Sequence, residues 1–399
     1  MKKKIFEKQI KLLPKTIEWC KSCVISNARP RIFFNKDGIC FACENKNYKN
    51  KIDWDKREAE LIKLLDKHRG NGSKWDVIVP SSGGKDSGFV AHQLKYKYGM
   101  NPLLVTWSPL KYTDIGIENF DSLNNSGFSN IRFSPNGIVQ RKLARLCLEE
   151  LGDAFHVFVL GQSFFPLNIA CETNIRLIIY GENGEVEYGG DKNLYNKSHI
   201  NLFKDAKWVS NYLKGDSSID GLLSWGFKNK GYLKEKYFNQ SDLKYHRSPS
   251  HRDLKKCGID RYYYYSYFKK WIPQENYYYC IDNTGFKSKL DRSEGTYSKY
   301  SSLDDKFDSF HYYFRYIKFG LGRCIDDAAH EIRDGHISRE EAVTLVRKYD
   351  GEFPDKYFEE FLEYLDISKK EFWKIVDSWR FPNVWKKQNK KWVLRHPIK

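Results

Sequence analysis

No apolar run in the sequence approaches the length of about 20 residues that a membrane-spanning helix requires. The first residues, Met1 to Phe6, are basic, but no hydrophobic region with a small-residue cleavage site follows them. Internal repeats and low-complexity linkers are absent as well. We therefore expect a cytoplasmic protein with a core of its own and no membrane partner.

Two common nucleotide-binding motifs are also missing. A Walker A loop would need glycine at position 79, which is Val79, and serine or threonine after Lys85, which is followed by Asp86. The Gly-x-Gly-x-x-Gly fingerprint of dinucleotide-binding domains does not occur here either. A nucleotide site in this region must use a different loop.

Acidic residues are too few to balance the basic ones. The chain has 68 Lys and Arg residues against 51 Asp and Glu residues, which gives a net charge of +17. Basic residues alternate with aromatic and acidic ones and form no block of the type found in nucleic-acid-binding arms. We interpret the charge as support for an anionic small ligand. The charge alone does not decide whether the protein binds tRNA, although we do not expect nucleic acid as the partner.

Four of the nine cysteines form two closely spaced pairs. Cys20 and Cys23 make one Cys-x-x-Cys pair, Cys40 and Cys43 make another, and sixteen residues separate the two pairs. This spacing is typical of a closed site in which four thiolates hold a structural Zn²⁺. An iron–sulfur cluster is the alternative occupant. Disulfides fit less well, because nothing marks the chain as secreted.

The other five cysteines are isolated: Cys147, Cys171, Cys257, Cys280 and Cys324. None lies in the Gly-x-Cys-x-Gly elbow that a class I glutaminase needs, and Lys2 stands where an N-terminal-nucleophile glutaminase needs cysteine. We expect these side chains to be buried or incidental.

The most informative segment is the hexapeptide Ser82-Gly83-Gly84-Lys85-Asp86-Ser87. It follows a predicted buried strand at 75–80 and precedes a predicted helix at 88–98, which Gly99 would end. Glycines let the backbone approach a ligand closely, and the N–H groups of a first helical turn favour a phosphate. The segment predicts a loop that binds a nucleotide phosphate; a glycine turn without a ligand is the alternative.

Strands and helices alternate through the first half of the chain. Further strands are predicted at 102–107, 130–133 and 176–180, and helices at 53–68 and 139–151. This order predicts the α/β class, with a parallel sheet wrapped by helices and ligands at the carboxyl ends of the strands. Capping boxes at 338–341 and 368–371 indicate that the C-terminal region is helical.

We divide the chain into four parts. Residues 1–70 form the cysteine module and a linking helix, and 71–200 form the nucleotide-binding domain. Residues 201–325 extend that domain towards the substrate, and 326–399 form the C-terminal helical region.

The hexapeptide resembles the pyrophosphate loop (PP-loop) of the N-type ATP pyrophosphatases, whose fold is like that of the adenine nucleotide alpha hydrolases. The resemblance implies that the loop holds the β- and γ-phosphates of ATP while a substrate oxygen attacks the α-phosphorus. Pyrophosphate then leaves, and the substrate is adenylated.

Over nearly its full length the chain resembles the N-acetyl sugar amidotransferase family of O-antigen and pseudaminic acid biosynthesis. The stretches that carry this resemblance, beside the cysteine pairs and the loop, are 179–183 with 188–190, 292–300, 318–324 and 331–337. The family transfers ammonia to a sugar carbonyl with release of AMP and pyrophosphate. An N-acetyl group would become an acetamidino group, and a uronate would become a carboxamide.

The resemblance implies ATP, Mg²⁺ and structural Zn²⁺ as cofactors, and a nucleotide sugar as substrate. It also implies that ammonia comes from a separate glutaminase subunit resembling the glutaminase of the histidine pathway, with or without a cyclase-like subunit. No enzyme nucleophile is required, so catalysis would depend on positioning and electrostatics.

The motifs yield a set of candidate site residues. The ATP phosphates are assigned to Ser82, Gly83, Gly84, Lys85, Asp86 and Ser87, and the adenosine to Thr106. The catalytic candidates are Lys85, Asp86 and Glu182. The sugar candidates are Asn183, Arg292, Glu294, Thr296, Tyr297 and Arg323. Each of the sugar candidates has a structural alternative as a turn residue or an ion pair.

Two other functions remain open from the sequence. A tRNA-modifying PP-loop enzyme of the thiolation or lysidine type would share the loop and suit the positive charge. A scaffold that has lost its chemistry would keep the cysteine pairs but has no need of an intact loop. The sequence does not specify the sugar, the product type or the oligomeric state.

Overall fold

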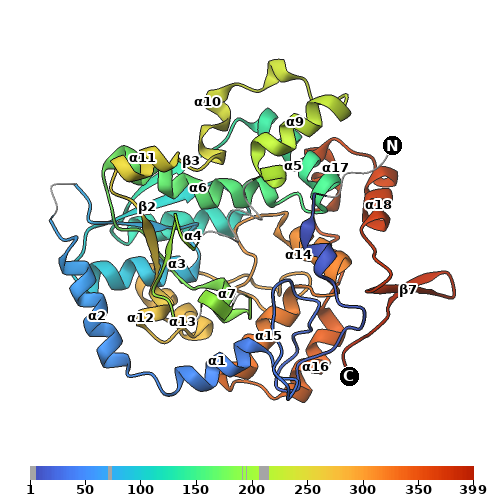
Figure 1. Ribbon diagram of the computed structural model, residues 1–399, viewed down its shortest axis with the longest axis horizontal. Coiled ribbons are helices and arrows are strands. Elements are labelled where there is room, and N and C mark those ends of the chain that lie inside the picture. The colour runs from blue at the N-terminus through green and yellow to red at the C-terminus, as the bar shows by residue number, and fades with distance from the viewer. Residues whose placement is uncertain (1–5, 71–73, 191, 195, 206–214) are drawn as a thin grey trace.

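The computed structural model describes residues 6–70, 74–190, 192–194, 196–205 and 215–399 (Figure 1). The basic residues 1–5 lie outside this described part of the chain. Three parallel strands form the first sheet: β1 (Val77–Pro80), β2 (Pro102–Trp107) and β3 (Ser129–Phe133), in the order β1-β2-β3. These are the strands that the apolar runs predict, and β1 begins two residues later than expected.

A second sheet continues the first. It contains β4 (Ile179–Tyr180) parallel to β6 (Arg261–Tyr264), with β5 (His199–Asn201) antiparallel to β6. A parallel bridge between Ile78 and Ile178 joins β1 to the start of β4. The carboxyl ends of β1, β2 and β4 therefore meet at one edge.

The first half of the chain supplies the helices that surround these strands: α1 (Phe41–Lys49), α2 (Trp54–Asp66), α3 (Lys85–His92), α4 (Asp114–Asn125), α5 (Gly137–Leu151), α6 (His156–Thr173) and α7 (Gly184–Glu187). The predicted helices at 53–68 and 139–151 correspond to α2 and α5. The middle of the chain adds α9 (Ile219–Asn229), α10 (Gln240–Leu243), α11 (His251–Lys256), α12 (Tyr265–Phe268) and α13 (Pro273–Thr284).

Helices cover both faces of the sheet. Side chains alternate along a strand, so Val77 and Val79 of β1 pack in one cluster with residues of α2 and α3. Ile78 of β1 and Val105 of β2 pack in the other cluster with α5 and α6. A sheet buried on both faces is the expected environment for parallel strands. This confirms the predicted α/β class, whereas the finer assignment to the PP-loop fold stays a prediction.

The close packing of α6 on β2 depends on Gly161. A Cβ atom at this position would lie 2.0 Å from the ring of Trp107. We therefore expect Gly161→Ala to force α6 away from the sheet and to lower the free energy of unfolding by about 3 kcal/mol. Denaturant titration measures this change.

Gly137, the first residue of α5, provides a control for that substitution. A Cβ atom there would meet no atom within 4 Å. Gly137→Ala should therefore leave the free energy of unfolding unchanged or raise it by up to about 1 kcal/mol. Equal destabilisation by both substitutions would contradict the role given to Gly161.

The C-terminal region is mostly helical. It contains α14 (Asp308–Phe319), α15 (Arg323–Asp334), α16 (Arg339–Tyr349), α17 (Phe358–Leu365) and α18 (Lys369–Ser378). Both predicted capping boxes are present, with Ser338 and Glu341 at α16 and Ser368 and Glu371 at α18.

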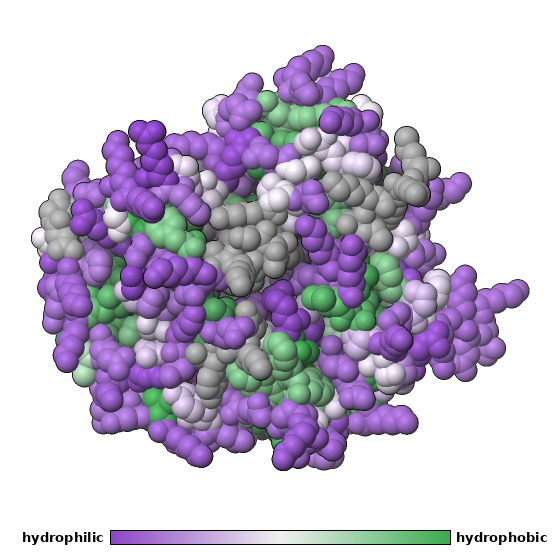
Figure 2. All heavy atoms as spheres, viewed as in Figure 1, coloured by the Kyte–Doolittle hydropathy of each residue, from purple (hydrophilic) through white to green (hydrophobic). Residues whose placement is uncertain are grey.

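The prediction of an entirely helical C-terminal region is wrong in one respect. Residues 385–394 form a hairpin of β7 (Trp385–Gln388) and β8 (Lys391–Leu394), which projects at the right of Figure 1 and forms a hydrophilic protrusion in Figure 2. Asn389 and Lys390 at its turn both have positive φ angles, which a two-residue hairpin turn requires.

The two ends of the chain pack against each other. The indole Nε1 of Trp19 donates to the carbonyl of His396 at 3.1 Å, and the Asn383 amide donates to the carbonyl of Pro14 at 2.9 Å. Figure 1 shows the loops before α1 beside α15 and α16. The cysteine module is therefore part of the packed molecule.

Within the described part of the chain, no single helix combines the length and the apolar composition needed to cross a membrane. The helices α5 and α6 meet these two criteria only when taken together, and they are bent by 117° relative to each other.

Candidate functional site

A pocket of about 270 Å³ opens at the carboxyl ends of β1, β2 and β4. One wall is polar and consists of residues from the hexapeptide and its surroundings: Ser81, Ser82, Gly84, Asp86, Ser87 and Glu182. The opposite wall is largely apolar and comes from β2 and α6: Val105, Trp107, Phe158, Gln162 and Pro166. Such a pocket can hold a ligand with an anionic end and a flat apolar end.

Gly83 is required by the shape of the loop. Its φ angle is +90°, and a Cβ atom would lie 2.7 Å from the backbone of Phe120 in α4. The Gly83 N–H donates to Ser81 Oγ at 3.3 Å, and Ser81 Oγ lies 2.9 Å from Ser87 Oγ. Ser81, which sequence analysis did not single out, thus connects the two ends of the turn.

The helix after the loop begins earlier than predicted. α3 starts at Lys85, with Gly84 in an extended conformation before it, and continues as a π-helix over Gln93–Lys97. Lys85, Asp86 and Ser87 therefore form the first helical turn. Because N–H groups of a first turn have no partner within the helix, this turn is suited to bind an anion.

Lys85 and Asp86 interact with each other. The Lys85 ammonium forms an ion pair with the Asp86 carboxylate, which also accepts a hydrogen bond from Asn276 Nδ2 at 3.1 Å. The Cys280 thiol donates to the Lys85 carbonyl at 3.0 Å. Asn276 and Cys280 belong to α13, about 190 positions further along the chain, and no local motif marks them.

Two of the residues assigned to ATP, Thr106 and Ser82, form hydrogen bonds with other parts of the protein. The Thr106 side chain is fully buried, and its hydroxyl donates to the Ser81 carbonyl at 2.6 Å. Thr106 is thus outside the pocket lining, while its neighbours Val105 and Trp107 face the pocket. Ser82 bonds with the Asp304 side chain, whose pKa is nevertheless raised by burial.

Glu182 lies in the pocket wall directly after β4. Burial raises its pKa to about 7, and the negative charge of Asp86 adds to this effect. A carboxyl group with this pKa can gain or lose a proton near neutral pH. Bound Mg²⁺ would favour its carboxylate form.

The raised pKa of Glu182 predicts a pH-dependent stability. The folded chain favours the protonated carboxyl, so the stabilisation is present below pH about 4.5 and is lost as pH rises through about 7. Glu182→Gln removes this titration. Between pH 5 and pH 8 the free energy of unfolding of the variant should therefore gain about 2 kcal/mol relative to the wild type.

Thermal unfolding of both proteins without nucleotide or metal measures this difference. Glu340→Gln, on the exposed side of α16, serves as the control and should follow the wild type across the range. A constant difference between Glu182→Gln and the wild type would contradict the prediction.

Asn183 faces away from this pocket. Its side chain is buried, accepts the N–H of Glu185 at 3.1 Å at the start of α7, and lines a separate small pocket beside α1. Glu182 and Asn183, which are neighbours in the sequence, thus lie in different pockets.

The remaining sugar candidates fall into two groups. Thr296 and Arg323 both bind Asp327 of α15, at 2.6 Å and 3.1 Å, and Arg323 also bonds to the Tyr312 hydroxyl. Tyr297 is close to Glu331 of the same helix, and burial raises its pKa.

Arg292 and Glu294 form the second group, on the side of α16 and α17. Arg292 makes two hydrogen bonds of 2.6 and 2.7 Å to Glu352, and Glu294 accepts the Lys356 N–H at 3.0 Å. The five candidates therefore do not converge on one point, and their binding to a sugar stays a prediction.

The segment that carries these candidates also reaches the loop. Tyr300 lies below the Lys85 ammonium, 5.5 Å from Nζ to the ring centre. Asp304 contacts Ser82 as described above. The part of the chain around 292–304 therefore contacts the Ser82–Ser87 turn.

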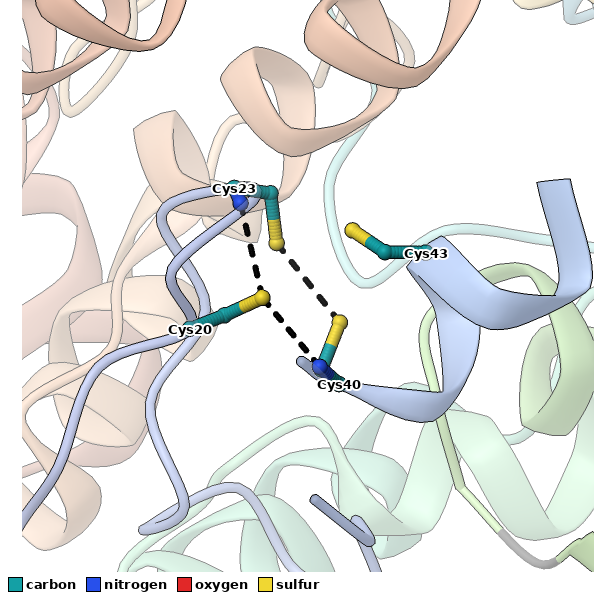
Figure 3. A group of neighbouring side chains, drawn as sticks. All are labelled: Cys20, Cys23, Cys40 and Cys43. Carbon is teal, nitrogen blue, oxygen red and sulfur yellow. Dashed lines mark hydrogen bonds between the residues drawn. The ribbon is translucent and has the colours of Figure 1, made fainter. Parts of the chain in front are cut away.

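The four N-terminal cysteines form a compact group (Figure 3). Their sulfur atoms lie within 4.8 Å of one another, and all four residues are buried. Cys23 Sγ and Cys40 Sγ are 3.6 Å apart, close to the distance of about 3.8 Å between two ligands in a tetrahedral zinc–thiolate site. The four sulfurs are thus near enough to hold one ion between them.

The surroundings of the sulfurs suit thiolates. The N–H groups of Ser22, Cys23 and Cys40 point at Cys20 Sγ, at 3.4, 3.4 and 3.2 Å. Arg333 of α15 is close enough for the cysteine charges to raise its pKa, against the effect of burial. Arg339 of α16 donates to the carbonyls of Cys20 and Cys23. The residues present fit a structural Zn²⁺.

Fold and site define an α/β protein with a polar pocket at the carboxyl edge of a parallel sheet and a four-cysteine metal-binding group. Residues 294–399 match the model of a family described as LPS biosynthesis protein WbpG-like, C-terminal domain. This match covers about a quarter of the chain. It supports a lipopolysaccharide biosynthesis family and, through it, an enzymatic role. A search of curated proteins finds no match to the chain.

Proposed function

We propose that the protein is the synthetase subunit of an ATP-dependent amidotransferase that modifies a sugar for a bacterial surface glycan. The observation that carries this proposal is the Ser82–Ser87 turn, placed at the start of α3 and at the carboxyl edge of a parallel sheet. The lipopolysaccharide match at 294–399 supports the sugar substrate.

In this proposal the pocket binds ATP with its phosphates at the polar wall. The first-turn N–H groups of α3 and the Ser82 and Ser87 hydroxyls hold the β- and γ-phosphates, and Lys85 neutralises their charge. The adenine lies against the apolar wall formed by β2 and α6. The exposed amide of Gln162 is placed to hydrogen-bond with its polar edge.

Asp86 and Glu182 are the carboxylates that would hold Mg²⁺. The metal ion would neutralise charge that develops on the phosphate oxygens. Phosphate binding would also bring Lys85 away from Asp86, because the phosphates offer it a stronger anionic partner.

The reaction converts a poor electrophile into a good one. The carbonyl oxygen of an N-acetyl group attacks the α-phosphorus, the bond to the β-phosphate oxygen breaks, and pyrophosphate leaves. Ammonia then adds to the activated carbon, loses a proton, and displaces AMP with the electron pair of the C–O bond. The product is an acetamidino group, or a carboxamide when the acceptor is a carboxylate.

Ammonia would come from a separate glutaminase subunit, with or without a cyclase-like subunit. The described cysteines support this, because Cys147, Cys280 and Cys324 are fully buried and no described cysteine lies in the pocket wall. The purified chain alone should use ammonium but not glutamine.

Product analysis tests the proposal. The chain is incubated with ATP, Mg²⁺, ammonium and a panel of N-acetylated nucleotide sugars and uronates. Phosphorus NMR should show AMP and pyrophosphate, and mass spectrometry should show exchange of oxygen for an NH group on one sugar. Formation of ADP would overturn it. AMP release only with tRNA would favour the tRNA-modifying alternative.

A further inference from the structure

A second pocket, of about 230 Å³, shares no lining residue with the nucleotide pocket. It lies between the beginning of the described chain, the loop that joins the two cysteine pairs, and helix α14. In Figure 1 the dark blue beginning of the chain runs beside α14. Four cationic side chains line this pocket: Arg29 and Arg31 from the loop, and Arg315 and Lys318 from α14.

Two acidic side chains also line the pocket, and both already have partners. Glu7 accepts a hydrogen bond from Lys318 Nζ at 3.1 Å, and these two side chains are only 4% and 5% exposed. The Asp153 carboxylate lies 2.9 Å from Nδ1 of His311, which lines the pocket as well. These carboxylates are therefore engaged by groups other than the three arginines.

The three arginines share two carboxylates among the residues that the structure describes. Arg31 makes two hydrogen bonds to Glu185, of 2.5 and 3.1 Å. Asp326 serves the other two: it lies 2.5 Å from Arg315 and 3.6 Å from Arg29. One guanidinium charge in the pocket wall thus lacks a carboxylate of its own.

Arg29 is the arginine with the weakest contacts. Its side chain is 19% exposed and lines the pocket, yet it donates no hydrogen bond within the described part of the chain. Burial lowers the pKa of its guanidinium, against the charge of Asp326, and the charges of Arg315 and Arg31 add to the lowering. Because a guanidinium carries five N–H donors and remains charged, it needs acceptors from elsewhere. An anion that enters the pocket would supply them.

We propose that this pocket binds the phosphate group of a small molecule, with Arg29 as the main ligand and Arg31 beside it. A guanidinium binds two phosphate oxygens at once, which an ammonium group does not do. A phosphate also has more oxygens than a carboxylate to share among several arginines. The pocket volume leaves room beside the phosphate for an organic part of the ligand. The inference is independent of the proposed function, because it involves neither the ATP pocket nor its chemistry.

Equilibrium dialysis of the full chain tests the proposal with two labelled probes, inorganic phosphate and glucose 1-phosphate. A salt concentration of about 150 mM screens attraction to exposed surface charge. We expect saturable binding of at least one probe to the wild type, and binding at least about tenfold weaker in Arg29→Gln. Tighter binding of glucose 1-phosphate would support a sugar phosphate as the ligand, and tighter binding of inorganic phosphate would support the free ion.

Two control variants locate the bound phosphate. Ser82→Ala changes the nucleotide pocket and should retain the binding that Arg29→Gln loses. Arg252→Gln removes the same charge from an exposed position on α11 and should bind like the wild type. If Arg29→Gln does not fold, as judged by its melting temperature, Arg29→Lys replaces it. That variant keeps the charge and loses the two-pronged contact, so it should also bind the phosphate more weakly.

Three results would overturn the inference. The first is the absence of saturable binding of either probe to the wild type. The second is a loss of binding in Ser82→Ala with none in Arg29→Gln, which would place the phosphate in the nucleotide pocket. The third is an equal loss in Arg29→Gln and Arg252→Gln, which would show attraction to the overall positive charge.

Discussion

Asp86→Ala should reduce the cleavage of ATP to AMP by more than about 100-fold while leaving the fold intact. Asp86 stands in the first turn of α3, lines the pocket, and forms an ion pair with Lys85. Its loss removes a carboxylate that would hold Mg²⁺ and frees the Lys85 side chain to move. Ser82→Ala should act in the same direction, because Ser82 lines the pocket and its hydroxyl is one of the proposed phosphate ligands.

The rate of AMP formation with the acceptor sugar and ammonium measures this effect. Circular dichroism and the melting temperature establish that the variants fold. Asp291→Ala, an exposed aspartate in the segment that contacts the loop, is the control and should keep its activity. Normal turnover in Asp86→Ala or Ser82→Ala would contradict the assignment of the site.

The second large effect concerns the cysteine group. We expect one zinc ion per chain, and Cys40→Ser should lose the metal together with several kcal/mol of stability. The four sulfurs come from two separate segments, so the metal would hold the segments together. Loss of the ion would also leave Arg333 buried beside fewer negative charges.

Elemental analysis and denaturant titration measure metal content and stability. Cys257→Ser, a partly buried cysteine outside the group, is the control and should keep the metal. If the protein contains iron and labile sulfide in place of zinc, the four cysteines hold an iron–sulfur cluster. A Cys40→Ser variant as stable as the wild type would contradict a structural metal.

The sequence predicts the strands well because each is defined by neighbouring residues. The runs at 75–80 and 102–107 are short and mostly apolar, as expected for strands buried on both faces, and the structure places β1 and β2 there. The capping boxes at Ser338 and Ser368 are also defined by residues only three positions apart, so the sequence predicts them directly. The predicted start of α3 at residue 88 is too late, because Lys85, Asp86 and Ser87 belong to the phosphate-loop motif and yet are tolerated in a first helical turn.

The site was only partly predictable, because many of its contacts are made between distant segments. Nothing near Asn276 or Cys280 indicates that α13 holds the start of α3. The burial of Thr106 and the opposite orientation of Asn183 and Glu182 follow from the packing of whole elements. Residue type and spacing indicate which chemistry is available, and tertiary packing decides which side chains meet.

The contact between the two ends of the chain has a consequence for its biosynthesis. Pro14 and Asn383 are 369 positions apart, so the ribosome must synthesise this long intervening stretch before the bond can form. The cysteine pairs are made well before α15 and α16, so they lack these contacts until those helices have been synthesised. Early capture of the metal by the nascent chain would protect these thiols from oxidation, and truncated transcripts should yield aggregating fragments in place of a stable amino-terminal domain.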